Sequence, residues 1–372
     1  MRVQSILKFL TMGLSVSAAA SAGSSPRRAV IKKANSAENK RVEILATDIL
    51  NEQARLGVGN AVADMGNIKS TITQLMNEIL KGEKQKALDI LKTEDVDINF
   101  QNKYKMTALM IAAQAGQKKI VDELLKKETI DVNLKSDNGN TALIEAISNN
   151  QTDIANQILD RDDVDVNIQK KDGNTALILA IYNNQPEVAK QILDREDVQV
   201  NIQNIDGCTA LIFAIDRNQP EIAKQILDRD DVYVNLQDIK GLTALIWAIA
   251  NNQPEIATKI LKKPNVNINL QDKEDYTALM VAIVNNQPEI AKQILDKDGV
   301  DIKLKNQIGK TALMVVIGRN QPEIAKEILK IPTINVKLKD MFGRTALEYA
   351  NQLHLKAIAN EIRKKETEGD NV

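Results

Sequence analysis

The residues that most often carry catalysis or bind transition metals are almost absent from this chain of 372 residues. It has one cysteine, Cys208, and one histidine, His354. Catalytic triads and zinc sites built from histidine and cysteine therefore lack the residues that they need. We expect no enzyme activity and no cofactor. We interpret Cys208 as an ordinary small residue, and a reactive thiol is the alternative interpretation.

Carboxylates are the one plentiful group with metal-binding chemistry. The acidic loops at residues 160–163 and 228–231 have a composition that calcium loops share. However, an arginine interrupts the acids in both loops, and neither has a glycine-turned shape with a bidentate acid. The chain also has no glycine-rich phosphate loop. We therefore expect no metal site and interpret these loops as solvated charge.

The overall charge and hydropathy restrict the class of partner. Lys and Arg number 49 and Asp and Glu number 50, which leaves a net charge of −1. Such a chain lacks the basic footprint of a nucleic-acid binder. Hydrophobic residues make up 43% and aromatic residues only 3%, so the core must be aliphatic. We therefore expect no nucleic-acid partner. We also expect no membrane-spanning segment in the mature chain, because no later segment is long and apolar enough to cross a bilayer.

The N-terminal segment, residues 1–22, has the pattern of a secretory signal peptide. Arg2 and Lys8 give a basic start, residues 9–20 form a short apolar stretch, and residues 20–22 match the small-residue cleavage pattern. Lys8 and several serines and threonines weaken the apolar stretch, so an uncleaved, disordered or amphipathic leader is the alternative. We predict export, to the periplasm or outside the cell, if the leader is functional, and a cytoplasmic protein otherwise.

Short segments flank the main part of the chain. Residues 23–36 are basic and predict a flexible linker. Residues 37–66 predict an N-terminal helical segment, because apolar positions recur at spacings of three to five from about residue 37 to residue 55. Gly57 and Gly59 interrupt this pattern, and a second helical run covers roughly residues 62–80. Residues 363–372 predict a polar C-terminal tail.

A sequence repeat organises the rest of the chain. The tripeptide Thr-Ala-Leu occurs eight times at one constant interval, beginning at Thr107, Thr141, Thr175, Thr209, Thr243, Thr277, Thr311 and Thr345. One further step back reaches Thr73, in a degenerate unit that we assign to residues 67–101 as an N-terminal cap. Eight full units then occupy residues 102–362. Such a solenoid grows by adding units and needs no central core, so the length does not require several globular domains.

The local signals within one unit predict its structure. In the unit of Thr175, Gly173 marks a turn, and the threonine stands where the N-cap of a short apolar helix belongs. Two asparagines interrupt that helix, and Pro186 suits the first position of a second helix. The apolar stripe of the second helix has helical spacing and consists of Val188, Ala189, Ile192 and Leu193. Each unit should therefore be a turn, a helix, a loop, a second helix and an extended arm, and the chain an all-α repeat solenoid.

These features together resemble the ankyrin repeat family, whose motif runs D-x-x-G-x-T-P-L-H-x-A, then a second helix ending in L-L, then D-V-N. The resemblance covers about residues 73–362. It implies an ankyrin-type stack of helix-loop-helix units with short β-hairpin-like connecting loops. A period of this length also fits tetratricopeptide repeats, but their Trp, Leu-Gly and Tyr positions are missing here.

The chain departs from the family motif at several positions. Alanine replaces the proline after every threonine, and Lys105 and Asp275 replace the turn glycine. In the last units, Lys303 and Lys337 replace an asparagine that recurs in the earlier ones. We expect these changes to alter the local hairpin geometry and the curvature without changing the fold.

The resemblance implies that a partner binds along the hairpin tips and the inner faces of the first helices. The tip positions lie four, three and one residues before each threonine, and the inner-helix positions lie four, seven and eight residues after it. From the fourth full unit onward the tips turn apolar, at Ile205, Cys208, Ile239, Leu242, Tyr276, Ile308, Met341 and Phe342. On the inner helices, the candidate aromatic anchors are Phe213, Trp247 and Tyr349.

A structural interpretation of these positions stays open. Residues four after the threonine can pack between helices, and contacts between neighbouring hairpins can explain the isoleucines. We predict a monomeric, non-enzymatic module that binds a protein partner through the concave surface of the stack. The alternative is a structural or self-assembling repeat protein that associates through its N-terminal helices or stack ends.

Overall fold

The computed structural model describes residues 63–93 and 96–369. The predicted signal peptide, the linker and most of the segment 37–66 lie outside the described residues. The described chain forms two compact units, an N-terminal unit that ends at Lys171 and a C-terminal unit that begins at Asp172. Each is considered by itself below. In neither described unit is any helix both long and apolar enough to cross a membrane.

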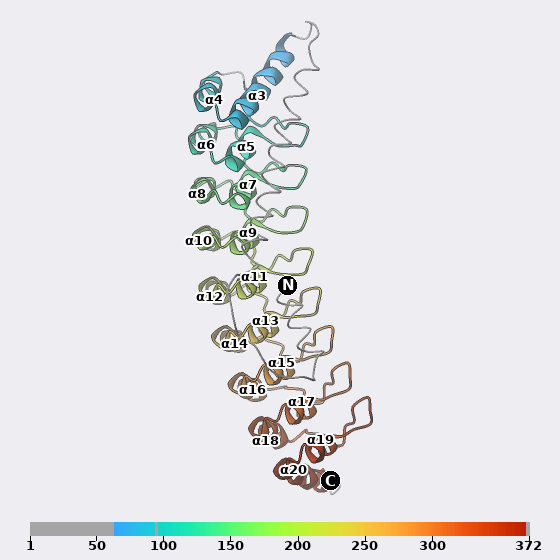
Figure 1. The fold of residues 1–372 in the computed structure, drawn as a ribbon. Coiled ribbons are helices and arrows are strands. Elements are labelled where there is room, and N and C mark those ends of the chain that lie inside the picture. Colours follow the sequence, from blue (N-terminus) through green and yellow to red (C-terminus); the bar gives the residue numbers. More distant parts are fainter. Residues whose placement is uncertain (1–62, 94–95, 370–372) are drawn as a thin grey trace, which may run out of the picture. The chain divides into compact units, whose positions relative to one another are not determined.

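The N-terminal unit is built from helix pairs (Figure 1). Its helices are α3 (Ala63–Lys81), α4 (Lys84–Leu91), α5 (Ala108–Gln114), α6 (Lys118–Leu125), α7 (Ala142–Ser148) and α8 (Thr152–Leu159). Thr73 lies inside α3 and does not begin a helix, and α3 also runs across the predicted boundary between residues 66 and 67. The degenerate unit therefore replaces the usual short first helix with a helix of 19 residues.

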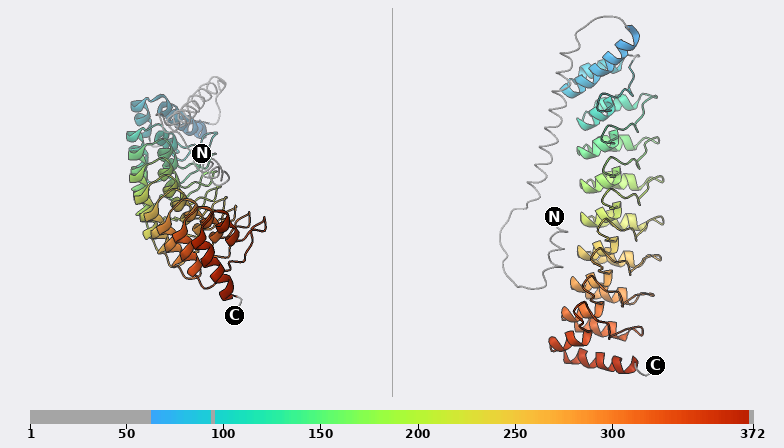
Figure 2. Two further views of the ribbon diagram at one scale, coloured as in Figure 1. Left: turned by 60° about the horizontal axis from the view of Figure 1, so that its bottom comes forward. Right: turned by 90° about the vertical axis from the view of Figure 1, so that its right-hand side faces the viewer.

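The C-terminal unit continues the same alternation. Its helices are α9 (Ala176–Tyr182), α10 (Pro186–Leu193), α11 (Ala210–Asp216), α12 (Pro220–Asp228), α13 (Ala244–Ala250), α14 (Pro254–Leu261), α15 (Ala278–Val284), α16 (Pro288–Leu295), α17 (Ala312–Gly318), α18 (Pro322–Lys330), α19 (Ala346–Gln352) and α20 (Lys356–Gly369). Within each unit the odd-numbered helices pack on one another and the even-numbered helices do the same. The hairpins project beside the odd-numbered, inner helices (Figures 1 and 2). Residues 363–369, expected to belong to a tail, continue α20, because the strong helix formers there do not break it.

Threonine caps start the inner helices as predicted. The hydroxyl of Thr243, in extended backbone, accepts a hydrogen bond of 3.3 Å from the amide of Ile246. All eight threonines make this bond, at 3.2–3.5 Å. Such a cap contributes about 1 kcal/mol to helix stability. The predicted proline at the start of the second helix is also confirmed, for example at Pro186.

The core lies between successive inner helices and between each inner helix and its outer partner. In α13, residues 244–249 are all buried, and Ala248 is fully enclosed. Glutamines add a polar connection between units, because the Gln253 amide donates to the carbonyl of Ile215, in the preceding inner helix, at 2.7 Å. A single unit has no neighbour to cover these faces, so stacking itself supplies the stability.

The hairpins keep one geometry despite their changes in sequence. The amide of Gly241 donates to the carbonyl of Asp238 at 2.8 Å, and a Cβ at Gly241 would lie 2.9 Å from the Cα of Asp272 in the next hairpin. Lys105 and Asp275 replace this glycine but adopt the same left-handed backbone, with φ of 56° and 61°, and retain the turn bond at 2.8 and 2.9 Å.

The hairpins that follow Lys303 and Lys337 also keep this turn bond, at 2.7 Å between Gly309 and Asn306 and at 3.0 Å between Gly343 and Asp340. The turn itself is therefore unchanged. The asparagines of the earlier units also bond to the next unit, as the Asn269 amide does to the carbonyl of Gly299 at 2.7 Å, so the expected effect on the rest of the hairpin and on the curvature stays a prediction. Hydrogen bonds within and between hairpins hold the turn and outweigh the preferences of single residues.

Candidate functional site

Large hydrophobic side chains are exposed along the hairpin tips of the C-terminal unit. They belong to five of the predicted residues, with exposed fractions of 68% for Ile205, 51% for Ile239, 39% for Ile308, 64% for Met341 and 64% for Phe342. We call these residues the apolar tips. Exposed apolar side chains that gather in one region are typical of interaction surfaces.

Contacts between neighbouring hairpins account for the backbone of the tips but not for their side chains. The amide of Ile239 donates to the carbonyl of Asp206 at 2.9 Å, and the amide of Met341 donates to the carbonyl of Ile308 at 3.1 Å. These bonds join each hairpin to the one before it. The side chains nevertheless remain exposed, so the packing of hairpins alone does not explain why these residues are apolar.

The tip residues directly before the threonines are less accessible. Cys208, Leu242 and Tyr276 are each partly buried. Burial is the main cause that raises the pKa of Cys208 to about 12, and the negative charges of nearby aspartates such as Asp238 add to this shift. Its thiol is therefore protonated at neutral pH, which favours the interpretation as an ordinary small residue over a reactive thiol.

Two of the three predicted aromatic anchors lie inside the stack. Trp247 is 6% exposed and Tyr349 is 7% exposed, so neither ring is presented to a partner. The indole nitrogen of Trp247 donates to the Asp238 carboxylate at 3.0 Å, and the hydroxyl of Tyr349 donates to the Asp340 carboxylate at 2.7 Å. The structural interpretation that the sequence left open applies here, because both side chains fasten a hairpin to its inner helix.

Asp340 shows how such a buried carboxylate stabilises a tip. Besides the Tyr349 hydroxyl, it accepts the amides of Phe342 and Arg344, both at 2.9 Å, and an Arg344 guanidinium nitrogen at 3.1 Å. Burial by itself raises the pKa of Asp340, but these hydrogen bonds together lower it below its usual value. The tip that exposes Met341 and Phe342 is therefore held from beneath by an ionised carboxylate.

Phe213, the third predicted anchor, is partly buried and belongs to an aromatic contact that the sequence did not reveal. The edge of its ring meets Tyr182, with the two centroids 6.1 Å apart, and the guanidinium of Arg217 lies 3.9 Å from the Tyr182 centroid. Tyr182 is 49% exposed. Tyr182 and Arg217 stand seven and eight residues after their threonines, so the inner-helix positions contained the signal, although neither residue was selected.

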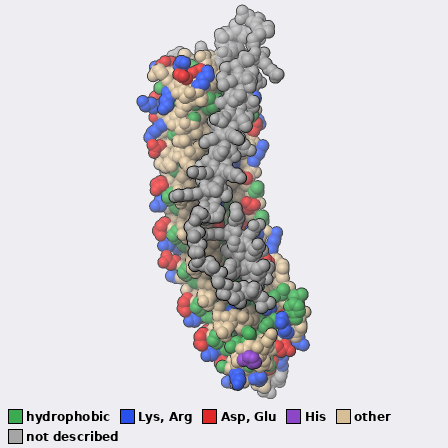
Figure 3. All heavy atoms as spheres, in the orientation of Figure 1, with side chains coloured by type: hydrophobic (Ala, Val, Ile, Leu, Met, Phe, Trp, Pro, Cys, Tyr) green, Lys and Arg blue, Asp and Glu red, His purple; other side chains and the backbone are tan. Residues whose placement is uncertain are grey.

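The charge of the hairpins changes along the C-terminal unit. The hairpin of residues 269–276 contains three acids and one lysine, whereas residues 303–310 and 337–344 together contain six basic residues and one acid. The apolar tips Ile308, Met341 and Phe342 stand in these two basic hairpins. In Figure 3, hydrophobic and basic side chains gather where the hairpins before α17 and α19 project.

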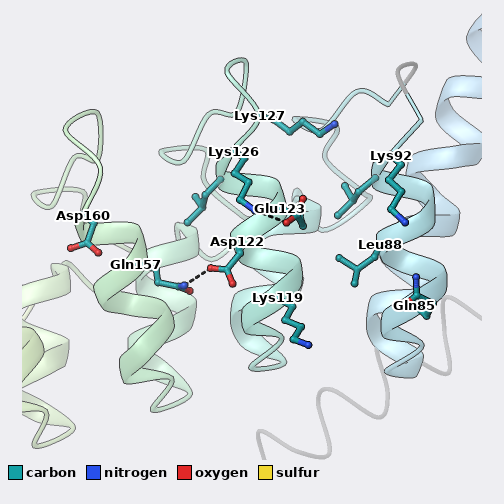
Figure 4. Close-up of a pocket in the computed structure, with 12 residues that line it drawn as sticks. Gln85, Leu88, Lys92, Lys119, Asp122, Glu123, Lys126, Lys127, Gln157 and Asp160 are labelled. Atoms are coloured by element: carbon teal, nitrogen blue, oxygen red, sulfur yellow. Dashed lines mark hydrogen bonds and ion pairs between the residues drawn. The ribbon is translucent and has the colours of Figure 1, made fainter.

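The N-terminal unit has an open hollow on its outer helices that offers a different kind of surface. Side chains of α4, α6 and α8 surround a volume of about 780 Å³ (Figure 4). Several of its polar groups bind one another, since Lys126 pairs with Glu123 at 2.6 Å and the Gln157 amide donates to Asp122. Across the described ranges, no three His, Cys, Asp or Glu residues are grouped as a metal ion requires. The hollow fits a solvated outer face better than a ligand site.

Comparison with known proteins identifies the repeat. None of the curated proteins compared with the chain matches it. Ankyrin repeats (3 copies) match residues 75–170, 159–238 and 229–306, which together span more than half of the chain. The matched ranges contain the same threonine-capped helix pairs and hairpins that the structure shows in each unit. The chain therefore belongs to the ankyrin repeat family, whose repeats generally serve as protein–protein interaction modules.

Proposed function

We propose that this protein binds a protein partner through the hairpin tips of its C-terminal unit and that it is not an enzyme. The observation that carries the proposal is the set of apolar tips, which expose five large hydrophobic side chains on hairpins of one unit. Covering such side chains contributes roughly 25 cal/mol per Å² of apolar area removed from water. Methionine and phenylalanine are also enriched in protein interfaces.

The support beneath the tips favours binding without a large loss of conformational entropy. Backbone hydrogen bonds connect the hairpins, and the buried Asp340 accepts two amides of its own tip. A surface that is already ordered loses less freedom when a partner binds, so more of the contact energy appears as affinity. The same property would allow long tip side chains to act as anchors on a fixed backbone.

Replacing Ile308, Met341 and Phe342 together with serine is expected to abolish partner capture. The three side chains are exposed, so the variant should keep the far-ultraviolet circular dichroism of the wild type. The measurement is an affinity capture from extracts of the native source, with bound proteins quantified by mass spectrometry. The same proteins captured at the same level by the triple variant would contradict the proposal.

Tyr233 provides a matched control for Phe342. Their exposed fractions are 61% and 64%, but Tyr233 lies between α12 and the next hairpin and is not a tip residue. Phe342→Ser should reduce capture at least about tenfold, as expected for an interface anchor. Tyr233→Ser should leave capture unchanged, because the proposed surface does not include it.

We further propose that the protein is exported and acts as a monomer. The basic start, apolar stretch and small-residue pattern of residues 1–22 support export. The charged residues of α20 support a monomer, because a polar end face is typical of a terminal repeat. Light scattering and intact mass should show one chain without residues 1–22. A mature protein that retains these residues, or a stable dimer, would contradict the respective proposal.

A further inference from the structure

Two cations lie against the ring of Tyr349, beneath the last two hairpins. The ammonium of Lys310 is 4.6 Å from the ring centroid and the guanidinium carbon of Arg344 is 4.7 Å from it. Arg344 also pairs with Asp340 at 3.1 Å, and the side chain of that aspartate has no exposed surface. The single acid of the two hairpins is thus enclosed and is already bonded to Arg344, Tyr349 and two backbone amides.

Lys310 and Arg319 have no comparable partner. No carboxylate in the described ranges lies within ion-pairing distance of the Lys310 ammonium or the Arg319 guanidinium. Burial, followed by the positive charge of Arg344, lowers the pKa of Lys310; the negative charge of Asp340 opposes this shift, and the positive charge of Arg319 adds to it. An incoming anion would relieve this repulsion, because an opposite charge within a few ångströms favours the charged form. We call Lys310, Arg319 and Arg344 the basic cluster.

Apolar and basic groups alternate on these two hairpins. Ile308 stands two residues before Lys310, and Phe342 stands two residues before Arg344, whose guanidinium lies 4.9 Å from the Phe342 ring centroid. A ligand that covers Ile308, Met341 and Phe342 therefore meets positive charge on the same two hairpins. Guanidinium and ammonium groups bind carboxylates strongly through charge-assisted hydrogen bonds.

We propose that the last two hairpins bind an acidic peptide segment of the partner, in which carboxylate side chains accompany apolar ones. This inference rests on the proposed binding function and adds the chemistry of the segment that is bound. The carboxylates would meet the basic cluster, and the apolar side chains would cover Ile308, Met341 and Phe342. The segment's net negative charge is the feature that distinguishes it from other possible partners of an apolar surface.

The neighbouring hairpin argues against a long polyanion as the occupant. Residues 269–276 contain Asp272, Glu274 and Asp275 against a single lysine. A phosphate backbone that extended beyond the two basic hairpins would meet this negative charge, whereas nucleic-acid binding requires an extended basic footprint. The positive region is as wide as two hairpins, which suits a short acidic peptide.

The test selects short random peptides, displayed on phage, against the full chain. Peptides that no longer bind when Ile308, Met341 and Phe342 are serine should contain more Asp and Glu than Lys and Arg. Their affinity should fall at least about tenfold for the double variant Lys310→Met, Arg319→Gln, as expected when close charge pairs are removed. Methionine retains the length of the Lys310 stem, and both changes leave the Arg344–Asp340 pair intact. Lys273→Met, on the acidic hairpin, is the control and should not weaken binding.

The outcomes separate this inference from the proposed function. Two results would overturn the proposal of an acidic segment but leave the binding function standing. The peptides that require Ile308, Met341 and Phe342 could be neutral or basic, or they could bind the double variant as tightly as the wild type. Peptides that ignore the apolar tips would overturn the proposed function. Recovery of no peptide would overturn the inference. Tighter binding of single-stranded DNA or phosphatidylserine vesicles, with the same dependence on Lys310, would assign the cluster to a polyanion instead.

Discussion

Replacing Asp340 with alanine is expected to lower the free energy of local unfolding of the last repeat by about 3 kcal/mol. The change leaves the buried hydroxyl of Tyr349 without its acceptor at 2.7 Å and deprives two tip amides of theirs. It also frees the guanidinium of Arg344, which is partly exposed and can be solvated instead. The measurement is hydrogen exchange of the amides in α19 and α20, which reports local opening of an end repeat.

Asp272 is the matched control, because it occupies the same hairpin position two units earlier. It accepts the amides of Glu274 and Tyr276 at 2.9 and 2.8 Å, but Val281 stands where the other unit has Tyr349. Asp272→Ala should therefore destabilise its hairpin less than Asp340→Ala destabilises the last one. Equal losses of protection would show that the Tyr349 and Arg344 bonds contribute nothing.

The two aspartates should also differ in their response to pH. The hydrogen bonds to Asp340 lower its pKa in the folded state despite its burial. Its contribution to stability is therefore present above the unfolded pKa of about 4 and is lost as the pH falls through the lower, folded value. Burial raises the pKa of Asp272, so its ionisation opposes folding as the pH rises. Protection of α19 and α20 should decline at acidic pH in the wild type and depend less on pH in Asp340→Ala.

Replacing Trp247 with alanine is expected to destabilise the C-terminal unit by about 3–5 kcal/mol, the usual range for removing a large buried aromatic side chain. The indole is 6% exposed, and its N–H donates to Asp238 at 3.0 Å. The change therefore leaves a cavity at an inner helix and removes a donor from a buried carboxylate. Urea unfolding followed by circular dichroism gives the loss.

Trp247→Phe separates the two contributions. Phenylalanine retains most of the ring volume but cannot donate to Asp238, so the expected loss is about 1–2 kcal/mol. The same experiments decide between a packing role and a partner anchor. If Trp247→Ala abolished partner capture with an unchanged urea midpoint, the buried, structural assignment of this residue would be wrong.

The fold could be predicted from the sequence because its signals repeat in register. A Thr-Ala-Leu in every full unit, with turn, break and proline at fixed offsets, determines the helix pairs without information on distant contacts. The extent of α20 could not be obtained in this way, whereas the separate helical run over roughly residues 62–80 predicted α3. Both terminal helices depart from the repeat, and local helix propensity decides where they end.

The candidate site was predicted less completely than the fold. The side chains of the apolar tips are exposed because they stand at turns, and turn positions can be recognised in the sequence. Trp247 and Tyr349 were misjudged as accessible anchors because the position four residues after the threonine lies inside the stack, where Val281 and Val315 are buried without any such bond. An aspartate nine residues earlier accepts a hydrogen bond from each of the two aromatic side chains there. A signal for this existed, since both hairpins carry aspartate five residues before the threonine and a hydrogen-bonding aromatic four residues after it. Asp272 with Val281 shows that the aspartate alone does not predict the pair.

The bond that joins successive hairpins has a consequence for how such a protein changes over generations. In the C-terminal unit, a backbone amide at the tip of each hairpin donates to a backbone carbonyl at the tip of the preceding hairpin. Ile239 donates to Asp206 in this way, and Met341 donates to Ile308. The bond is made by backbone atoms at equivalent positions, so duplication or deletion of one whole repeat would leave every donor facing an acceptor. Descendants would thus gain or lose recognition surface in whole hairpins while the joints between units stayed the same.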